Sequence, residues 1–374
     1  TIPSGGYILC SGIYAKNTEF VMLGGNIVNN SSPSQAGTSG GGVYVSNFSI
    51  FYMYNGKISD NGTECYGGGV SVSDASNFVM YGGEISANRA KSRGDGVYLN
   101  NGSDMIISGG KVCGNPSVRK SGNYGGGVGV YSSTLTITGG EIFDNMSGGI
   151  DVMDSDVTIS GGEIYNNESQ ANGGGLRASS HSDVTISGGR IYGNTAKQRG
   201  GGIYTEKNSF TVTGGEITGN TAVQESAGVL CNSDKINFGG NPVIKNNTVT
   251  GQSNGDRHNF VLGSGKRINF ISKMEDDAEV FITCQTVSAY SGNQSYIKYH
   301  NVNGVPLDPN KYFESSSETK TILLLDSELC DLSGAPQKIT FKTAYASTPA
   351  ELTETTGYYG AWYNYAKDSK IQYE

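Results

Sequence analysis

A seven-residue phrase, Gly-Gly-x-Ile-x-x-Asn, recurs through most of this 374-residue chain and constrains its fold more than any other feature. Some copies are degenerate, and successive copies lie 22 to 31 residues apart, most of them 26 or 27. Self-similarity at a fixed period of about 20 to 50 residues is the signature of a solenoid or another repeat architecture. The last residue of the phrase stands at Asn30, Asn61, Asn88, Asn115, Asn145, Asn167, Asn194, Asn220 and Asn247.

Each period also contains two short stretches with the alternation of β-strands. One is entered through glycines, as in Gly67–Val72 and Gly94–Leu99, and the other alternates apolar and polar residues, as in Leu135–Thr138. No helical period is present, and a propeller blade needs four strands in about 40 residues. The pattern therefore predicts an all-β parallel β-helix with three short strands per coil of about 27 residues.

The repeated letters have distinct expected roles in such a coil. Alternate residues such as Val70, Val72, Val97 and Leu99 should point inward and stack into apolar columns. Paired glycines allow positive φ at a corner where a side chain would clash. We expect the repeated Asn to tolerate the left-handed conformation at the next corner and to hydrogen-bond its neighbour one coil away, as an Asn ladder.

These residues carry a resemblance to known proteins. The alternation of Gly-Gly-Gly-Val with Gly-Gly-x-Ile-x-x-Asn resembles the repeats of the polymorphic outer-membrane proteins, whose signature pairs G-G-A-[ILV] with F-x-x-N. Over about residues 20–247 it also resembles the wider pectate-lyase-like superfamily of right-handed parallel β-helices. The resemblance implies a right-handed coil in a bacterial protein that is secreted or on the cell surface. It implies little about activity, because this scaffold hosts adhesins, lyases, hydrolases and phage tail proteins.

Composition excludes several classes of function. The net charge is −8 with a pI near 5.0, and basic clusters are absent, which argues against a nucleic-acid or anionic-membrane surface. No apolar run is long enough to span a bilayer as a helix. The three histidines lie far apart, so a zinc site or a Ser-His-Asp triad is poorly supplied. The chain begins at Thr1 without Met, and we expect a processed form whose targeting signal has been removed.

The six cysteines show no C-x-x-C spacing, which argues against a metal knuckle or a redox motif. Scattered cysteines in a chain of this length favour buried small apolar side chains over a disulfide framework. They are Cys10, Cys65, Cys113, Cys231, Cys284 and Cys330.

The glycine rhythm fades after about residue 250, which divides the chain into three expected parts. Residues 1–257 are β-helix repeats, 258–335 are irregular terminal coils, and 336–374 are a C-terminal cap or a linker. Within 357–365 lie the only Trp and four Tyr, which would cover the end of the rod or stack on sugars. Residues 285–320 are expected to be rich in loops. Further strands are expected at 259–262, 268–271, 280–283, 321–325 and 339–343.

A first candidate site follows from aligning the middle residues of the glycine-entered strands. In that file Asp151 and Arg177 are neighbours, with Tyr98 and Tyr204 farther along, a combination that suits a sugar polymer. The resemblance to uronic-acid lyases implies that Asp151, Asp154 and Asp156 would supply carboxylates for Ca²⁺, with Arg177 as the base. The alternative is an exposed cross-strand ion pair of less than about 1 kcal/mol. The whole file is Tyr44, Ser71, Tyr98, Gly129, Asp151, Arg177, Tyr204 and Leu230.

Two more files follow the Gly-Gly pairs. In the first, charges mostly alternate in sign, but Glu141 stands next to Glu163, either as an acid pair with a raised pKa or as a solvated repulsion. The second holds the aromatic residues Phe143, Tyr165 and Tyr192, which would stabilise the solenoid or form a platform for glycan rings. The charged file is Asn26, Lys57, Glu84, Lys111, Glu141, Glu163, Arg190, Glu216 and Asn241.

The sequence favours a non-catalytic function. The coils are regular, the longest gaps are about nine residues, and no catalytic constellation recurs. We expect an adhesin-like module, a monomer without a cofactor or metal, that contacts a polysaccharide, host glycans or matrix surfaces. The alternative is a polysaccharide lyase or glycoside hydrolase on the same scaffold, with Asp151 and Arg177 as catalytic residues and Ca²⁺ if it is a lyase. A third possibility is a structural spacer.

Overall fold

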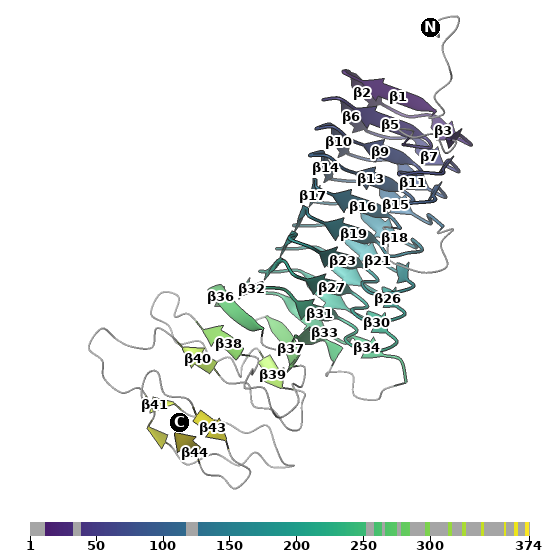
Figure 1. Ribbon diagram of the computed structural model, residues 1–374. Coiled ribbons are helices and arrows are strands. Elements are labelled where there is room, and N and C mark those ends of the chain that lie inside the picture. The colour runs from purple at the N-terminus through teal and green to yellow at the C-terminus, as the bar shows by residue number, and fades with distance from the viewer. Residues whose placement is uncertain are drawn as a thin grey trace, which may run out of the picture.

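The repeats form a rod of stacked coils in which most strands pair with the equivalent strands of the neighbouring coils (Figure 1). The computed structural model describes residues 12–32, 39–116, 126–251, 258–263, 266–274 and 278–284, and short strands beyond them. Three ladders of parallel strands run along the rod, because a period-2 pattern repeated at a constant step brings equal letters to equal heights. The predicted parallel β-helix with three strands per coil is therefore confirmed.

The first ladder contains the glycine-entered strands. It consists of β1 (Ile13–Lys16), β5 (Val43–Ser46), β9 (Val70–Val72), β13 (Val97–Leu99), β16 (Val128–Tyr131), β19 (Ile150–Met153), β23 (Leu176–Ser179), β27 (Ile203–Glu206), β31 (Val229–Asn232) and β35 (Phe260–Leu262).

The second ladder contains the alternating strands. It consists of β2 (Glu19–Met22), β6 (Ile50–Met53), β10 (Asn77–Met80), β14 (Asp104–Ile107), β17 (Thr134–Ile137), β20 (Asp156–Ile159), β24 (Asp183–Ile186), β28 (Ser209–Val212), β32 (Lys235–Gly240), β36 (Arg267–Met274), β38 (Tyr296–Tyr299) and β40 (Leu324–Asp326).

The third ladder follows the Gly-Gly pairs. It consists of β3 (Asn26–Val28), β7 (Lys57–Ser59), β11 (Glu84–Ser86), β15 (Lys111–Cys113), β18 (Glu141–Phe143), β21 (Glu163–Tyr165), β25 (Arg190–Tyr192), β29 (Glu216–Thr218), β33 (Val243–Lys245), β37 (Glu279–Cys284) and β39 (Phe313–Ser315). Strand β37 also pairs with β35 and so joins this ladder to the first.

Two-residue strands after the third ladder form short parallel ladders of their own. One holds β4 (Ser31–Ser32), β8 (Gly62–Thr63) and β12 (Arg89–Ala90), and the other holds β22 (Glu168–Ser169), β26 (Thr195–Ala196), β30 (Thr221–Ala222) and β34 (Thr248–Val249). Two antiparallel pairs lie near the C-terminus: β41 (Lys338–Ile339) with β42 (Thr355–Thr356), and β43 (Tyr363–Tyr365) with β44 (Ile371–Tyr373).

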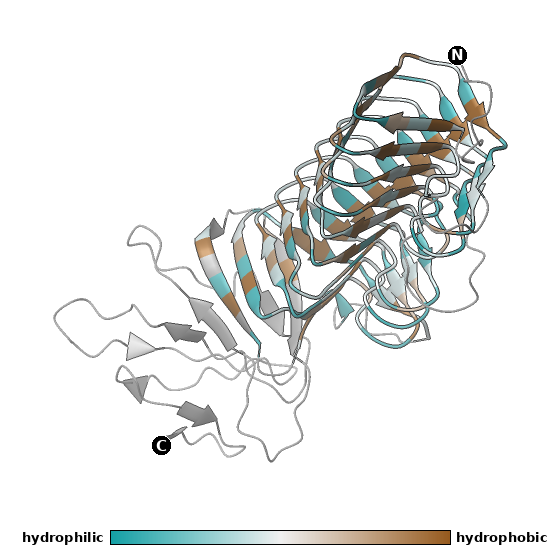
Figure 2. Ribbon diagram, turned by 45° about the horizontal axis from the view of Figure 1, so that its top comes forward, coloured by the Kyte–Doolittle hydropathy of each residue, from teal (hydrophilic) through white to brown (hydrophobic). Residues whose placement is uncertain are grey.

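The core is the inside of the coil, where the expected apolar columns lie. Val70, Val72, Val97 and Leu99 are fully buried, and rungs from all three ladders belong to one continuous cluster. Figure 2 shows the hydrophobic bands repeating from coil to coil. Ile85, Val112 and Ile142 stand directly above one another, as the repeat predicts.

The predicted Asn ladder is confirmed, but its conformation differs from the expectation. In each rung, as between Asn61 and Asn88, the backbone N–H and side-chain Nδ2 of one Asn both donate to Oδ1 of the next, here at 3.0 Å. The left-handed residue is the one before the ladder Asn, for example Asp60 (φ 58°) or Ala87 (φ 55°). The ladder Asn turns its amide into the coil, where burial makes a saturated hydrogen-bond chain necessary.

The C-terminal expectations have mixed outcomes. The strands expected at 259–262, 268–271 and 280–283 are present as β35, β36 and β37, and β40 and β41 overlap the last two. Within 285–320, expected to be rich in loops, the strands β38 and β39 continue the ladders, and segments such as Tyr-Ile-Lys-Tyr have strand propensity. Within 357–365 only β43 is described, so the choice between cap and sugar contact lies outside the described residues.

The cysteines whose side chains are described are free thiols. Cys113 and Cys231 are buried and Cys65 is half-buried, as expected for small apolar side chains rather than a disulfide framework. Burial raises the pKa of Cys113 to about 11, so this thiol stays protonated at neutral pH.

Candidate functional site

The first candidate file lies in the register that the repeat predicts. The middle residues of the first ladder pair in sequence order, so that Gly129 stands next to Asp151, Asp151 next to Arg177, and Arg177 next to Tyr204. These side chains point away from the coil interior. The sequence thus places the two candidate catalytic residues, Asp151 and Arg177, in contact.

The expectation that this outward file is exposed was wrong. Tyr98, Asp151 and Tyr204 are only 6 %, 2 % and 8 % exposed. The chain folds back over the strand just before entering it: a Cβ on Gly94, which has φ +65°, would lie 2.8 Å from Cβ of Tyr98. Only glycine fits this close approach, so the glycines that mark the strand entry also cover its outer face.

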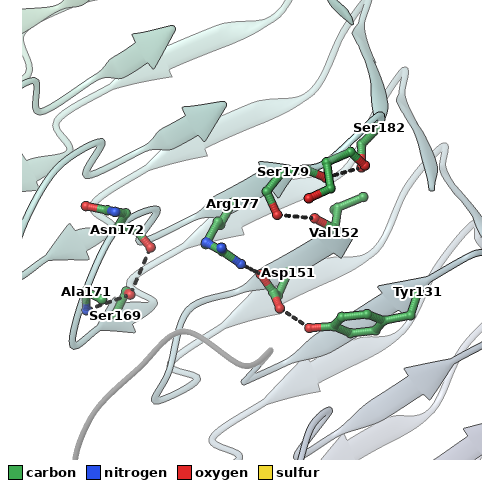
Figure 3. Close-up of polar contacts among 10 residues, drawn as sticks. Tyr131, Asp151, Val152, Ser169, Ala171, Asn172, Arg177, Ser179 and Ser182 are labelled. Atoms are coloured by element: carbon green, nitrogen blue, oxygen red, sulfur yellow. Dashed lines mark hydrogen bonds and ion pairs between the residues drawn. The ribbon is translucent and has the colours of Figure 1, made fainter. Parts of the chain in front are cut away.

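The coil that carries Asp151 has an unusually short entry. Four residues separate Asn145 from Ile150, whereas eight separate Asn167 from Leu176 one coil later. Neighbouring side chains cover Asp151: Arg177 Nη1 donates to Asp151 Oδ1 at 2.7 Å, and Tyr131 Oη donates to Asp151 Oδ2 (Figure 3). The Asp151 side chain is 3 % exposed and the Arg177 side chain 20 %. The alternative of an exposed ion pair is therefore corrected to a buried one.

The electrostatics of this network bear on catalysis. Burial lowers the pKa of Arg177, but the charge and hydrogen bond of Asp151 outweigh it, so the net pKa is raised. Burial, followed by the Asp151 charge, raises the pKa of Tyr131 well above its usual value. Arg177 therefore stays protonated and Tyr131 neutral. Both oxygens of Asp151 already accept a hydrogen bond.

The three aspartates do not fit a Ca²⁺ site. Asp151 is tied to Arg177 and Tyr131, Asp154 lies in the exposed turn after β19 within 3.6 Å of His181, and Asp156 begins β20 on the face of the second ladder. Ca²⁺ needs six to eight converging oxygens, roughly. Among the described residues, no group of three or more His, Cys, Asp and Glu side chains is placed to share a metal ion.

The two tyrosines predicted to bind sugar from this file are covered. The Tyr98 ring stacks on Tyr66 with centroids 4.7 Å apart, and Tyr204 donates its hydroxyl to Glu206 at 2.9 Å. Burial raises the pKa of both Tyr98 and Tyr204 to about 12. Their role in binding stays a prediction.

The predicted aromatic file on the third ladder is a continuous stack. Phe143 and Tyr165 have centroids 4.8 Å apart and Tyr165 and Tyr192 5.0 Å apart, with nearly parallel planes. Lys111 lies 5.9 Å from the centroid of the Phe143 ring and Arg190 4.6 Å from that of the Tyr192 ring. Ring faces that neighbours already occupy leave mainly ring edges for a ligand.

The charged file beside this stack is also internally paired. Each glutamate of the Glu141–Glu163 pair accepts from the tyrosine of the following coil, Glu141 from Tyr165 at 2.7 Å and Glu163 from Tyr192 at 2.9 Å. Lys111 lies 3.7 Å from Glu141, and Arg190 3.4 Å from Glu163. The two carboxylates therefore have separate partners that offset their repulsion.

The last member expected in the charged file was wrong. Val243, not Asn241, pairs with Glu216. The six-residue strand β32 extends through Gly239 and Gly240, and Asn241-Pro242 adds two residues before the third ladder resumes. In this degenerate copy of the phrase, the residue that pairs with Glu216 therefore lies three positions after the second glycine instead of one.

A scan against protein-family models finds one family, described as a right-handed β-helix region, matching residues 10–155 and 116–269. The chain belongs to this family. Comparison with curated proteins and with solved structures gave no match. The family establishes the right-handed β-helix, while the finer resemblance to polymorphic outer-membrane proteins stays a prediction. In the described part of this β-helix, no helix has the length and apolar character needed to cross a bilayer.

Sequence reasoning missed one surface of the β-helix. The outer face of the second ladder bears the paired file Val21, Tyr52, Val79 and Ile106, followed by Thr136, Thr158, Thr185 and Thr211. Val21 and Ile106 are both 41 % exposed. The signal was present in the strand endings, which change from Val-Met-Tyr at residues 79–81 to Thr-Ile-Thr at 136–138. Exposed contiguous apolar residues mark interaction surfaces.

Proposed function

We propose that this β-helix is a non-catalytic, adhesin-like rod of a secreted or surface-attached bacterial protein, and that it contacts glycans or matrix surfaces. The observation that carries the proposal is the state of its best catalytic candidate. Asp151 is buried, and both of its carboxylate oxygens are engaged by Arg177 and Tyr131. An acid, base or nucleophile has to reach the reacting atoms of its substrate.

The outer faces support a binding role. Aromatic rings are stacked in files on the second and third ladders, and regular strands hold them at a fixed spacing. Rigid aromatic side chains offer large contact areas at low entropy cost, which suits a polymer that lies along a surface. The fold itself is compatible with both adhesins and carbohydrate-active enzymes, so the side chains on its surface distinguish a binding role from a catalytic one.

One observation favours the alternative of a polysaccharide lyase or glycoside hydrolase. Asp151 and Arg177 are in contact beside the shortest entry turn in the described rod. In that alternative a substrate would displace Tyr131 from Asp151, and the pair would act on the polymer.

A screen of polyuronates and neutral polysaccharides, with and without Ca²⁺, separates the two. Binding is read by affinity electrophoresis and turnover by the release of reducing or unsaturated ends. We expect binding without turnover, and equal binding by Asp151→Asn and the exposed control Asp156→Asn. Turnover that Asp151→Asn abolishes, while Asp156→Asn keeps it and both variants stay folded, would establish the enzyme instead.

A further inference from the structure

An open aromatic stack lies at the end of three strands of the second ladder. Backbone hydrogen bonds place Tyr54, Tyr81 and Ser108 at the same position of successive coils, with Leu23 before them. The rings of Tyr54 and Tyr81 have centroids 4.8 Å apart and are 48 % and 47 % exposed. The next residue, Ser108, has no ring, so the stack ends on the face of Tyr81 that looks toward Ser108.

This end differs from the ends of the stack on the third ladder. There, Lys111 lies over Phe143 and Arg190 over Tyr192, and the tyrosine hydroxyls donate to glutamates. Stacking at the strand spacing makes the next rung of an aromatic file the natural place for another ring. On the second ladder, that rung is the space above Ser108.

The residues around this rung offer both apolar and polar contacts. Ile106 stands on β14, two residues before Ser108, and is 41 % exposed. Asp104 begins the same strand, is exposed, and points to the same face, about 7 Å from Ile106 and about 14 Å from Ser108 along the strand. The aromatic face and the aliphatic floor match the C–H face of a pyranose ring, and the carboxylate farther along the strand can accept from the hydroxyls of a neighbouring sugar in the same polymer.

We propose that Tyr81, Ile106 and Ser108 form a subsite for one pyranose ring of a neutral glycan, and that Asp104 contacts a neighbouring sugar of the same polymer. This inference rests on the proposed function and names its site and ligand class. The sugar ring stacks on the face of Tyr81 that looks toward Ser108 and its rim contacts Ile106, while hydroxyls of a neighbouring sugar donate to Asp104. The acidic balance of this edge, Glu19 and Asp104 without a basic residue between them in the file, favours a neutral sugar over a polyuronate.

Charge also argues against a second copy of the chain as the occupant of this face. If a two-fold axis parallel to the strands related two copies, the rods would run in opposite directions and Glu19 of one copy would face Asp104 of the other. If the two-fold axis were parallel to the rods, the facing strands would run in opposite directions, and these carboxylates would face Leu23 and Ser108 of the other copy. The first arrangement sets like charges together and the second buries a carboxylate against an apolar side chain, and both oppose association.

The test measures binding of soluble neutral polysaccharides (a glucan, a mannan and a galactan) and of a polyuronate to the whole chain. Tyr81→Ala removes the stacking face, and we expect binding of the neutral polymer to weaken about tenfold, while Tyr81→Phe retains it. Ser108→Tyr fills the rung with a protein ring, and we expect it to weaken binding as well. Thr185→Ala, on the same face of the second ladder but three coils beyond Ile106, is the control and should bind like the wild type.

The outcomes separate this inference from the proposed function. If the wild type binds neither neutral nor acidic polymers, the proposed function fails and the subsite with it. If it binds a neutral polymer and Tyr81→Ala and Ser108→Tyr leave the affinity unchanged, only the subsite is overturned. Binding of the polyuronate alone overturns the ligand class. A dimer in sedimentation that Tyr81→Ala dissociates overturns the subsite in favour of a self-interface. Circular dichroism confirms that each variant retains its β structure.

Discussion

Two outward files of the same coil have opposite environments. On the first ladder, Tyr98, Asp151 and Tyr204 point outward and are nearly inaccessible, whereas on the second ladder Val21, Tyr81 and Ile106 point outward and are 41 % to 47 % exposed. For Tyr98 the difference arises from the chain before the strand, and for Asp151 it arises from the side chains of Arg177 and Tyr131. The entry to the first ladder folds over the strand through glycines such as Gly94, whereas among the described residues the outward side chains of Val21 and Ile106 on the second ladder stay partly exposed.

A strand of a β-helix therefore has more than two environments. Period-2 alternation separates inside from outside, but the connections decide whether outside means solvent. A tyrosine or an aspartate in the covered file contributes to stability, and the same residue type in the open file is available for binding. Substitutions should therefore divide into two groups according to the ladder.

The largest effect is expected for Asp151→Ala in the covered file. The substitution leaves the Arg177 guanidinium largely buried without its partner, and we expect a loss of about 3 kcal/mol in the free energy of unfolding. Urea denaturation followed by circular dichroism measures it. Asp156→Ala, on the exposed face of β20, should change the free energy by less than about 0.5 kcal/mol. Equal values for the two variants would remove the distinction between the files.

A pair of tyrosine truncations compares the two files directly. Tyr98→Ala opens a cavity beside Tyr66 and should cost about 2 to 3 kcal/mol, whereas Tyr81→Ala should cost about 1 kcal/mol or less, because half of its surface is already hydrated. Thermal or urea unfolding of both variants provides the check. A greater loss for Tyr81→Ala than for Tyr98→Ala would reverse the assignment.

The covered tyrosines should also make stability depend on alkaline pH. Burial raises the pKa of Tyr98 and Tyr204 to about 12, above the value near 10 in the unfolded chain. The contribution of these tyrosines to the free energy of unfolding is therefore full below about pH 10 and is lost as the pH rises toward about 12. Unfolding midpoints measured across this range should fall, and Tyr98→Phe should reduce the slope. A slope unchanged in Tyr98→Phe would show that this hydroxyl does not contribute.

The smallest effect is expected on the third ladder, where the outward charged side chains are partly exposed and pair with one another. Lys111 is half-exposed and 3.7 Å from Glu141, so Lys111→Ala should cost less than about 1 kcal/mol. The loss should shrink in high salt, because solvent-exposed pairs are screened. Comparing unfolding curves at low and high ionic strength checks this, and a salt-independent loss would point to packing of the lysine on Phe143 instead.

Much of the fold follows from the sequence because the repeat is simple. A constant step between copies determines which residues stack, so the columns of Val and Ile, the Asn ladder and the contact between Asp151 and Arg177 were all predictable. The step also predicted the stack of Phe143, Tyr165 and Tyr192. At Asn241-Pro242 the repeated phrase is degenerate, and the alignment from sequence predicted the wrong pairing partner for Glu216, because β32 is longer than the preceding strands of its ladder.

Burial could not be predicted in the same way. The glycines before the first ladder indicated tight corners, but their number did not reveal that the corner lies on top of Tyr98 and Arg177. The left-handed residue was assigned to the ladder Asn, although the preceding residue supplies it, because Asn is favoured both there and in buried hydrogen-bond chains. The open face around Tyr81 was missed because the alternating strands were used only to predict the fold, and their outward residues were not aligned from coil to coil.

Chemical modification of tyrosines, mapped by mass spectrometry on the folded chain, tests the central claim most directly. Nitration under conditions that preserve the β structure should modify Tyr54 and Tyr81 readily and leave Tyr98, Tyr131 and Tyr204 protected until the chain unfolds. Modification of Tyr98 and Tyr204 at the rate of Tyr81 would contradict the account, because it would show that the first ladder is as open to solvent as the second.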